Sequence, residues 1–305
     1  MWHNAGFAVT KKSDPSRFLV RKAYKVAHDF AMRLDQKSYP AFESYEDVLV
    51  SFGAVCRALL FEFDHQGQDV RNRIIRNFIA RTGVLTRAIY TLWRMQDYQD
   101  AWVLHRCLMD RLFHLHHLAD KNEFKMFEAW SFMKQYNALN AVRSEPEFDV
   151  SRDGPSFTAT AERKERAKTL SASRQEWEGW KRPKAEEVAK QLDMRFLYKY
   201  GYDFASAHTH PMANDGSMDF FITTGIEPAE PLDDQRAVLF NTLIVATMLV
   251  KEGLVASKLL WHKAVVGFLD DMLAFVKDGS GGYKERCLSV AKIFEAGERL
   301  SQKKS

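Results

Sequence analysis

Cysteine is scarce in this chain of 305 residues, which contains only Cys56, Cys107 and Cys287. Three cysteines that are odd in number and far apart suggest neither a disulfide framework nor the paired spacing of a zinc site. Cys56 and Cys107 lie within apolar helical patterns, where cysteine usually behaves as a small hydrophobic residue. This usage fits a reducing compartment, and we expect a cytoplasmic protein.

The sequence also lacks the segments that direct a protein to a membrane or anchor it there. Its longest apolar stretch, residues 237–250, includes Asn241 and is followed by Lys251 and Glu252. The stretch is shorter than the ~20 apolar residues that a membrane-spanning helix needs. The first residues show no basic segment followed by an apolar one, as a secretory signal would. We therefore expect a buried core helix and no membrane partner.

Motifs of several large enzyme classes are missing too. The chain has no Gly-rich phosphate loop and no His-Glu-x-x-His or Cys-x-x-Cys motif. No aspartate at a readable spacing completes a nucleophilic triad with a serine and a histidine, which argues against a hydrolase of that kind. The net charge of +4 permits an anionic partner without requiring one.

Helical periodicity is what the sequence does contain, and almost nothing alternates with period two. It predicts an all-α fold, a multi-helix bundle with a charged helical insertion. We expect an N-terminal bundle region over residues 1–141, the insertion over 142–193, and C-terminal helices over 194–305 that complete the same bundle. The expected helices begin near Pro15 and after Ser44, and then cover about 69–94, 97–119, 123–141, 234–261, 264–277 and 283–300.

The middle of the chain changes character. Turn-forming residues fill 142–160, and the charged stretch 161–181 reads as a solvated helix or mobile insertion rather than a core element. Apolar and aromatic residues return over 194–207, and the glycines and prolines of 211–231 predict an irregular segment.

The expected helix 97–119 carries one polar stripe beside its apolar face. The stripe has helical spacing and consists of Arg106, Asp110, His114 and His117. Arg106 and Asp110 lie four residues apart and can pair directly. Such a stripe is either a solvated face with a weak surface ion pair or the lining of a pocket at a helix–helix contact.

A second polar cluster follows the insertion. If a helix continues to Pro211, Tyr202, Ser206 and His210 share one face of it. Together these side chains offer hydrogen-bond donors, an acceptor and a group that titrates near neutral pH. The alternative is a helix end whose polar side chains cap backbone carbonyls. Because both clusters adjoin apolar faces, we expect the two helices to contact each other.

Two further features of the sequence concern ligands. Four arginines lie on one side of the helix 69–94, where they could follow phosphates or simply form a solvated face; they are Arg73, Arg76, Arg87 and Arg94. The histidine spacing suits no familiar metal site, so we expect no metal and no cofactor. Were a metal present, the leading candidates for its ligands would be Asp110, His114, His117 and His210.

The run from Trp102 to Asp110, with residues 115–118 after it, resembles a widespread bacterial family of helical proteins that carries only a domain-of-unknown-function label. That family typically has an arginine and an acidic residue four apart, matched by Arg106 and Asp110. After a charged insert it shows Tyr-x-x-x-Ser-x-x-x-His, matched by Tyr202, Ser206 and His210. The match covers about residues 75–225. Asp110 departs from the more frequent glutamate, which shortens the reach of the pair.

The family resembles, distantly, the HEPN-type helical domains of toxins and antiphage systems. This implies an effector that acts on RNA or a nucleotide in bacterial stress or phage defence, with metal-independent ribonuclease-like activity. Arg106 would stabilise phosphate charge, His210 would act as acid or base, and Tyr202 and Ser206 would orient them. Arg111 and His116 also have the Arg-x4-His spacing of HEPN ribonucleases, although Leu112 stands where those enzymes usually have a polar residue.

The second hypothesis is a non-catalytic interaction module, with a second copy of the chain or another protein as partner. In that case the same residues form a buried polar network that fixes the register of the helices.

Overall fold

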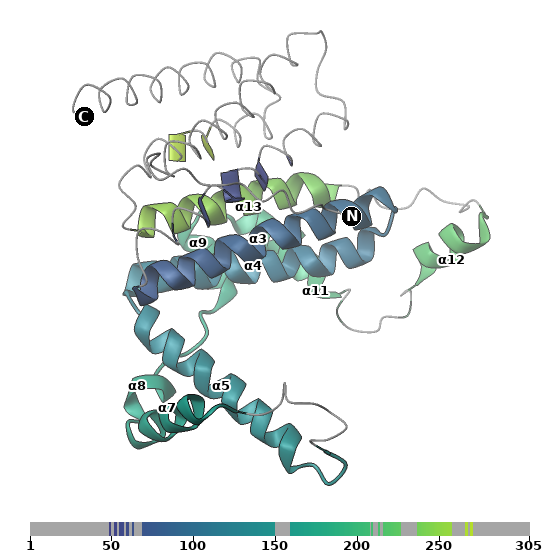
Figure 1. Cartoon of the computed structure of the whole chain (residues 1–305). Coiled ribbons are helices and arrows are strands. Elements are labelled where there is room, and N and C mark those ends of the chain that lie inside the picture. The colour runs from purple at the N-terminus through teal and green to yellow at the C-terminus, as the bar shows by residue number, and fades with distance from the viewer. Residues whose placement is uncertain are drawn as a thin grey trace, which may run out of the picture.

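Three long helices, α3 (Val70–Arg94), α4 (Tyr98–Lys121) and α13 (Ala237–Ala256), pack against one another in the computed structural model (Figure 1). The structure describes residues 69–149, 159–207, 209, 213, 216–226 and 237–257, and helical positions 49, 52, 53, 55–57, 59, 60, 63, 266, 267, 269 and 270. These residues contain helices and no β-strand, which confirms the all-α prediction. The expected helices near Pro15 and over 283–300 lie outside them.

Local signals set the ends of α3 and α4. The side chain of Asp69 accepts a hydrogen bond from the backbone N–H of Asn72, and that of Asp97 accepts one from Asp100. Such N-caps satisfy amide groups that have no partner within the helix. Asn122 ends α4 in the left-handed conformation, with φ of 55°.

Helix α13 is the core helix that its apolar sequence predicted. It is the one helix among the described residues long and apolar enough to cross a membrane by length and composition, but 72% of that apolar window is buried inside the protein. Two of its polar side chains have partners on α4: Thr242 Oγ1 lies 3.0 Å from His105 Nδ1, and Glu252 Oε1 lies 2.8 Å from His116 Nδ1.

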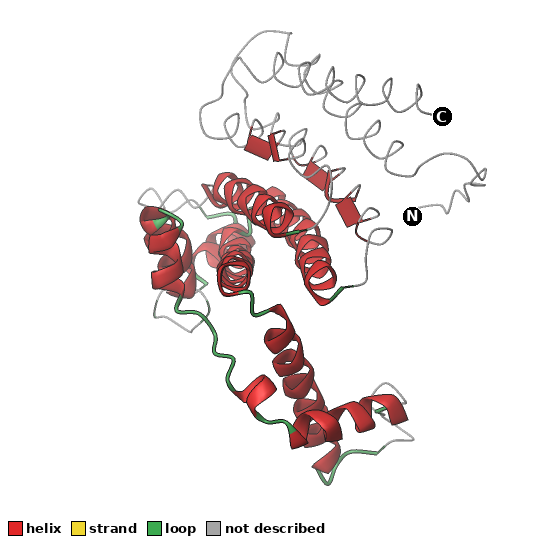
Figure 2. Ribbon diagram, turned by 90° about the vertical axis from the view of Figure 1, so that its left-hand side faces the viewer, coloured by secondary structure: helices red, strands yellow, loops and turns green. Residues whose placement is uncertain are grey.

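Helix α5 (Phe124–Ser144) leads away from this core, and α7 (Ala161–Ala172) and α8 (Gln175–Glu178) pack on it (Figure 1, Figure 2). A small apolar cluster joins α5 and α7; its buried members are Ala129, Met133, Ala167 and Leu170. Glu128 of α5 accepts from both Arg73 of α3 and Arg166 of α7. Helices α5, α7 and α8 together are called the arm. The Arg73–Glu128 pair links the arm to the core, and the Arg166–Glu128 pair joins α7 to α5 within the arm.

The charged stretch 161–181 is helical as expected, but its end is not solvated. Trp180 is only 2% exposed and belongs to the main hydrophobic core. The prediction was wrong here because it rested on the average charge of the stretch. Burying the large aromatic side chain of Trp180 stabilises the fold more than the charged neighbours oppose it.

The chain then returns along α4 through a series of short elements. They are α9 (Ala185–Gln191), α10 (Arg195–Leu197), the π-helix η2 (Tyr198–Asp203) and α11 (Phe204–Ala207). The expected helix up to Pro211 ends earlier, because α11 stops at Ala207 and Thr209 lies in a turn. A π-helix is rare and widens the turn, which changes the direction of the side chains that follow it.

Part of the segment expected to be irregular, 211–231, forms helix α12 (Ser217–Thr224). Gly216 and Gly225 flank it in the left-handed conformation, with φ of 76° and 68°. These glycines were read as loop formers, whereas they begin and end a short helix.

Gly201 lies at the closest contact between η2 and α4. A Cβ atom there would lie 2.9 Å from His105 Nε2 and 3.0 Å from Met109 Sδ, and both side chains are fully buried. We expect Gly201→Ala to lower the free energy of unfolding by about 1–3 kcal/mol in urea denaturation, because neither side chain has room to move. Gly53→Ala is the control, since nothing lies within 4 Å of its added Cβ. Equal stability of the two variants would contradict the close packing.

Candidate functional site

The two polar clusters expected from the sequence contact each other. Arg106 Nε donates to Ser206 Oγ at 2.8 Å, and the Ser206 hydroxyl donates in turn to the backbone carbonyl of Tyr202 at 2.6 Å. The Tyr202 hydroxyl donates to Asp110 Oδ1 at 3.0 Å. Residues about a hundred positions apart thus form one partly buried network between α4 and the η2–α11 segment.

Arg106 and Asp110 do not pair with each other, contrary to the expectation from their spacing. Within the described part of the chain, no ion pair joins them. The Arg106 guanidinium lies over the Tyr202 ring instead, with Cζ 4.9 Å from its centroid. Tyr202 on η2 and Ser206 on α11 replace the intrahelical pair. Their contacts with the Arg106 guanidinium and the Asp110 carboxylate are partly shielded from water, whereas an ion pair on an exposed helix face would be weak.

Tyr202 remains a hydrogen-bond donor at neutral pH. Its partial burial and the neighbouring Asp110 carboxylate raise the pKa of the phenol above its usual value near 10. The Asp110 carboxylate accepts the phenolic hydrogen, so the orientation of this bond is fixed.

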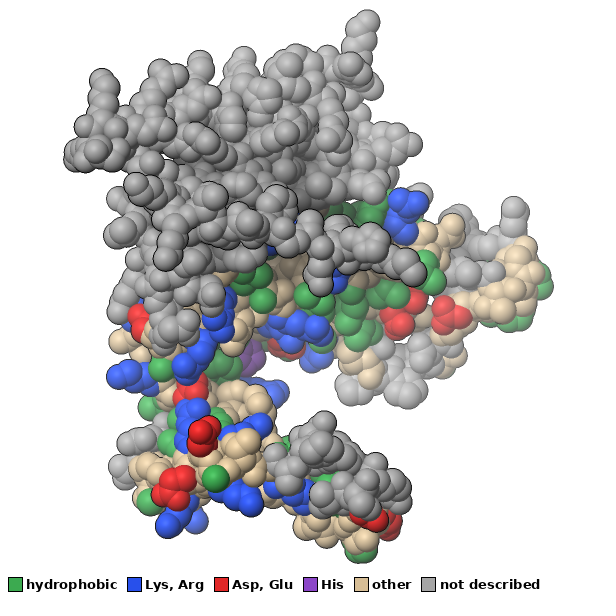
Figure 3. Space-filling model, in the orientation of Figure 1, with side chains coloured by type: hydrophobic (Ala, Val, Ile, Leu, Met, Phe, Trp, Pro, Cys, Tyr) green, Lys and Arg blue, Asp and Glu red, His purple; other side chains and the backbone are tan. Residues whose placement is uncertain are grey.

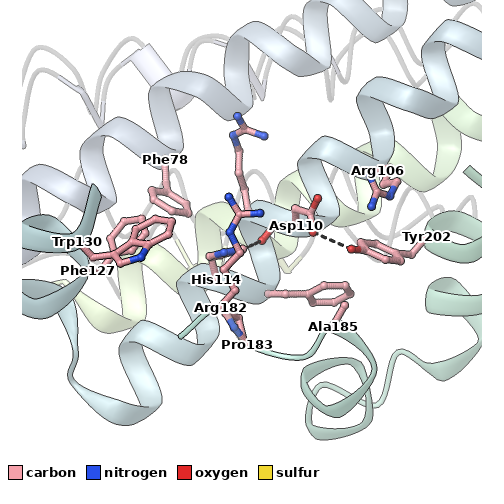
Figure 4. A pocket seen from close by; sticks show the side chains of 12 residues that line it. Phe78, Arg106, Asp110, His114, Phe127, Trp130, Arg182, Pro183, Ala185 and Tyr202 are labelled. Atoms are coloured by element: carbon pink, nitrogen blue, oxygen red, sulfur yellow. Dashed lines mark hydrogen bonds between the residues drawn. The ribbon is translucent and has the colours of Figure 1, made fainter. Parts of the chain in front are cut away.

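This network forms one side of a cavity of about 520 Å³ (Figure 4). The opposite side is aromatic and apolar, and the loop before α9 adds a charged side chain. The lining residues are Phe78, Arg106, Asp110, Arg111, Phe113, His114, Phe127, Trp130, Arg182, Pro183, Ala185 and Tyr202. The cavity has the size of a small-molecule site, typically ~300–1,000 Å³.

The aromatic wall comes from α5 and the loop after α8. The rings of Phe127 and Trp130 stack with centroids 6.0 Å apart. The buried Trp180 lies behind them, 4.4 Å from the Trp130 ring and 4.9 Å from the Phe127 ring. Arg182 Cζ lies 5.7 Å from the Trp130 centroid. A planar group could stack on this wall, since rings and guanidinium groups favour such contacts.

The charged residues of the cavity are mostly basic. Three guanidinium groups, those of Arg106, Arg111 and Arg182, outnumber the single carboxylate of Asp110. Arg111 also donates to the backbone carbonyl of Cys107 at 2.5 Å. Figure 3 shows Lys and Arg side chains with a histidine where the arm meets the core. The cavity therefore favours an anionic ligand.

His114 lines the cavity beside the aromatic wall. Its Nδ1 is 2.6 Å from the backbone carbonyl of Asp110, one turn earlier in α4. Its ring centroid lies 5.8 Å from that of Trp180 and 6.4 Å from that of Phe127. Burial lowers the pKa of His114 below its usual 6.5, so the ring is neutral at pH 7.

The other histidines of α4 face different surroundings. His116 pairs with Glu252 on α13, so the Arg111–His116 spacing does not bring these two residues to one site. His117 Nε2 lies 3.4 Å from Glu123. No group of three or more potential metal ligands occurs in the described ranges. His210 lies outside the described residues.

The four arginines of α3 do not line the cavity. Arg73 pairs with Glu128 at 3.3 Å, Arg76 donates to Asn77, and Arg94 Nη1 donates to the Tyr90 hydroxyl at 3.2 Å. Arg87 lines a separate, more apolar cavity between α3 and the helical positions 49–60. Binding of nucleic acid along this helix therefore remains a prediction.

Several lining residues were not predicted. Arg111 was considered only for its spacing to His116, and Arg182, Phe127 and Trp130 were not proposed for the site at all. Their places in the sequence give no signal for it, because they belong to the charged insertion and to the arm.

The Tyr202–Asp110 bond can be measured directly. We expect Tyr202→Phe to lower the free energy of unfolding by about 1 kcal/mol in the wild type and by much less in an Asp110→Ala background. Urea denaturation of the four proteins gives the coupling between the two residues. If Tyr202→Phe costs the same in both backgrounds, this hydrogen bond does not contribute to stability.

Comparison with known proteins adds a family without a known activity. No curated protein and no solved structure matches the chain. A family model described as a family of unknown function (DUF5677) matches residues 72–226, which include every residue that lines the cavity. The chain belongs to the DUF5677 family.

Proposed function

We propose that the protein binds RNA or a nucleotide in this cavity. The observation that carries the proposal is that one cavity of about 520 Å³ is lined both by three arginines and by the aromatic wall. The arginines are Arg106, Arg111 and Arg182. Guanidinium groups bind phosphate oxygens with charge-assisted hydrogen bonds, and aromatic rings stack on nucleobases of any sequence. A nucleotide presents both chemical groups at a spacing that such a cavity accommodates.

In this proposal the protein is a HEPN-like helical effector, with a role in bacterial stress or phage defence implied by the sequence resemblance. Arg106 stabilises negative charge on a phosphate, while Tyr202 and Ser206 hold Arg106 and Asp110 in place. The acid or base assigned to His210 completes a metal-independent ribonuclease-like activity. We further propose that the protein acts in the cytoplasm.

A specific observation favours the second candidate, a non-catalytic interaction module. Four of the five predicted site residues, Arg106, Asp110, Tyr202 and Ser206, hydrogen-bond to one another, as a network that fixes helix register requires. The two functions differ in one measurable respect, because a binding site takes up a ligand and a structural network does not.

The test is binding by the full chain without a histidine tag. Titrations with 5′-AMP, 5′-CMP and a short single-stranded RNA, followed by tryptophan fluorescence, report on Trp130 and Trp180. We expect saturable quenching that weakens with added salt, and RNA cleavage that persists in EDTA. Arg182→Ala should weaken binding, whereas Arg81→Ala, an exposed arginine of α3 outside the cavity, should not. Absence of binding by all three probes at millimolar concentration would overturn the proposal.

A further inference from the structure

The hydrogen bond of His114 fixes which ring nitrogen carries the proton. A backbone carbonyl only accepts hydrogen bonds, so Nδ1, 2.6 Å from the carbonyl of Asp110, must be the protonated nitrogen of the neutral ring. Nε2 then carries a lone pair and acts only as an acceptor. No described residue donates a hydrogen bond to Nε2.

The position of this acceptor suits the edge of a stacked base. His114 lines the cavity beside the wall on which a base would stack, and Arg106 lies on the far side of the cavity from Phe127 and Trp130 (Figure 4). With its phosphate at Arg106 and Arg111 and its base against Phe127 and Trp130, a nucleotide would bring the edge of its base toward the His114 ring.

We infer that His114 selects nucleobases with an amino group at the position of adenine N6 or cytosine N4, where guanine and uracil have a carbonyl oxygen. The preferred ligands are therefore adenine or cytosine nucleotides. This inference rests on the proposed function. An amino N–H donates to Nε2, whereas the uracil carbonyl at the same position is a second acceptor and leaves both groups without a partner. A site that hydrogen-bonds one group discriminates against the analogue that lacks it.

The groups around His114 keep Nε2 unprotonated at neutral pH. Burial is the largest cause of the lowered pKa of His114, and the positive charge of Arg182 acts in the same direction. The Asp110 carbonyl and carboxylate oppose them without reversing the result. Protonation in acid would turn the acceptor into a donor, so the preference for an amino group should disappear at low pH.

The experiment compares 5′-AMP with purine riboside 5′-monophosphate, which differs only by the missing amino group, and 5′-CMP with 5′-UMP. We expect the wild type to bind the amino-bearing nucleotide of each pair about 3- to 10-fold more tightly. His114→Phe keeps an aromatic ring but removes the acceptor, and should bind both members of each pair equally. His117→Gln, on the same helix but outside the cavity, should keep the wild-type preference.

The outcomes separate the two proposals. Equal binding of both members of each pair by the wild type overturns the role of His114 and leaves the nucleotide site standing. An unchanged preference in His114→Phe does the same. Failure of all four nucleotides to bind overturns the role of His114, and failure of the single-stranded RNA as well overturns both proposals. If thermal melting shows that His114→Phe is unfolded, the comparison of 5′-AMP with purine riboside 5′-monophosphate on the wild type decides alone.

Discussion

Replacing Arg106 with alanine should abolish most ligand binding while leaving the fold largely intact. A charge-assisted hydrogen bond to a phosphate contributes ~1.5–3 kcal/mol, so binding of 5′-AMP or single-stranded RNA should weaken ~10- to 100-fold. The cost to the free energy of unfolding should stay near ~1 kcal/mol. Arg106 is only partly buried, and the Ser206 hydroxyl keeps its bond to the Tyr202 carbonyl when the guanidinium is removed.

Two controls make this result interpretable. Arg81→Ala removes an exposed arginine outside the cavity and should change neither binding nor stability. Arg106→Lys keeps the charge but loses the planar fork, so its binding should fall between those of the wild type and the alanine variant. If Arg106→Ala instead melts several degrees lower and the wild type binds no nucleotide or RNA, the residue is structural and the interaction-module hypothesis is favoured.

Acidification should destabilise the protein strongly through His105. This side chain is fully buried, its Nδ1 lies 3.0 Å from Thr242 Oγ1, and burial lowers its pKa to about 3. In the unfolded chain the pKa of this histidine is about 6.5. Below that pH the unfolded state therefore binds a proton that the folded state does not bind. His105 therefore costs no stability above pH 6.5, and stability is lost as the pH falls from 6.5 toward 3.

The expected loss from His105 is about 3 kcal/mol between pH 7 and pH 4.5, because each pH unit below 6.5 costs about 1.4 kcal/mol. Urea denaturation at the two pH values measures it. Carboxylates titrate in the same range, so the comparison is made with His105→Gln, which has no charged form and can still reach Thr242. The variant should be less stable at pH 7 but lose much less on acidification. A pH dependence identical to that of the wild type would refute a proton-linked role of His105.

His116 has the opposite effect on the pH dependence of stability and reduces the net loss of stability in acid. Its hydrogen bond to Glu252 raises the pKa of the imidazole. The stability from this pair is present below pH 6.5 and is lost as the pH rises through the raised pKa. Because both side chains are partly exposed to solvent, the contribution is small and offsets only part of the loss from His105.

The sequence by itself determined the class of fold and the identity of its central helices. Apolar residues at helical spacing exclude strands, and the apolar stretch 237–250 becomes the buried helix α13, since a surface that is apolar all round has to be covered. Spacings of four residues also grouped Arg106 with Asp110 and Tyr202 with Ser206, and these four residues form one network in the structure. The grouping was possible because residues i and i+4 lie on one face of a helix whatever that face contacts.

Tertiary structure alone decided which partners those residues take. Arg106 and Asp110 could pair along their own helix, yet the η2–α11 segment, about a hundred residues later, supplies better-placed groups to both. Three histidines of α4 show the same dependence: His105 is buried and neutral, His114 lines the cavity, and His116 pairs with α13. Their spacing along the helix determines that they point in different directions. What each one meets depends on how α5, α13 and η2 pack around α4, and periodicity within one helix carries no information about that packing.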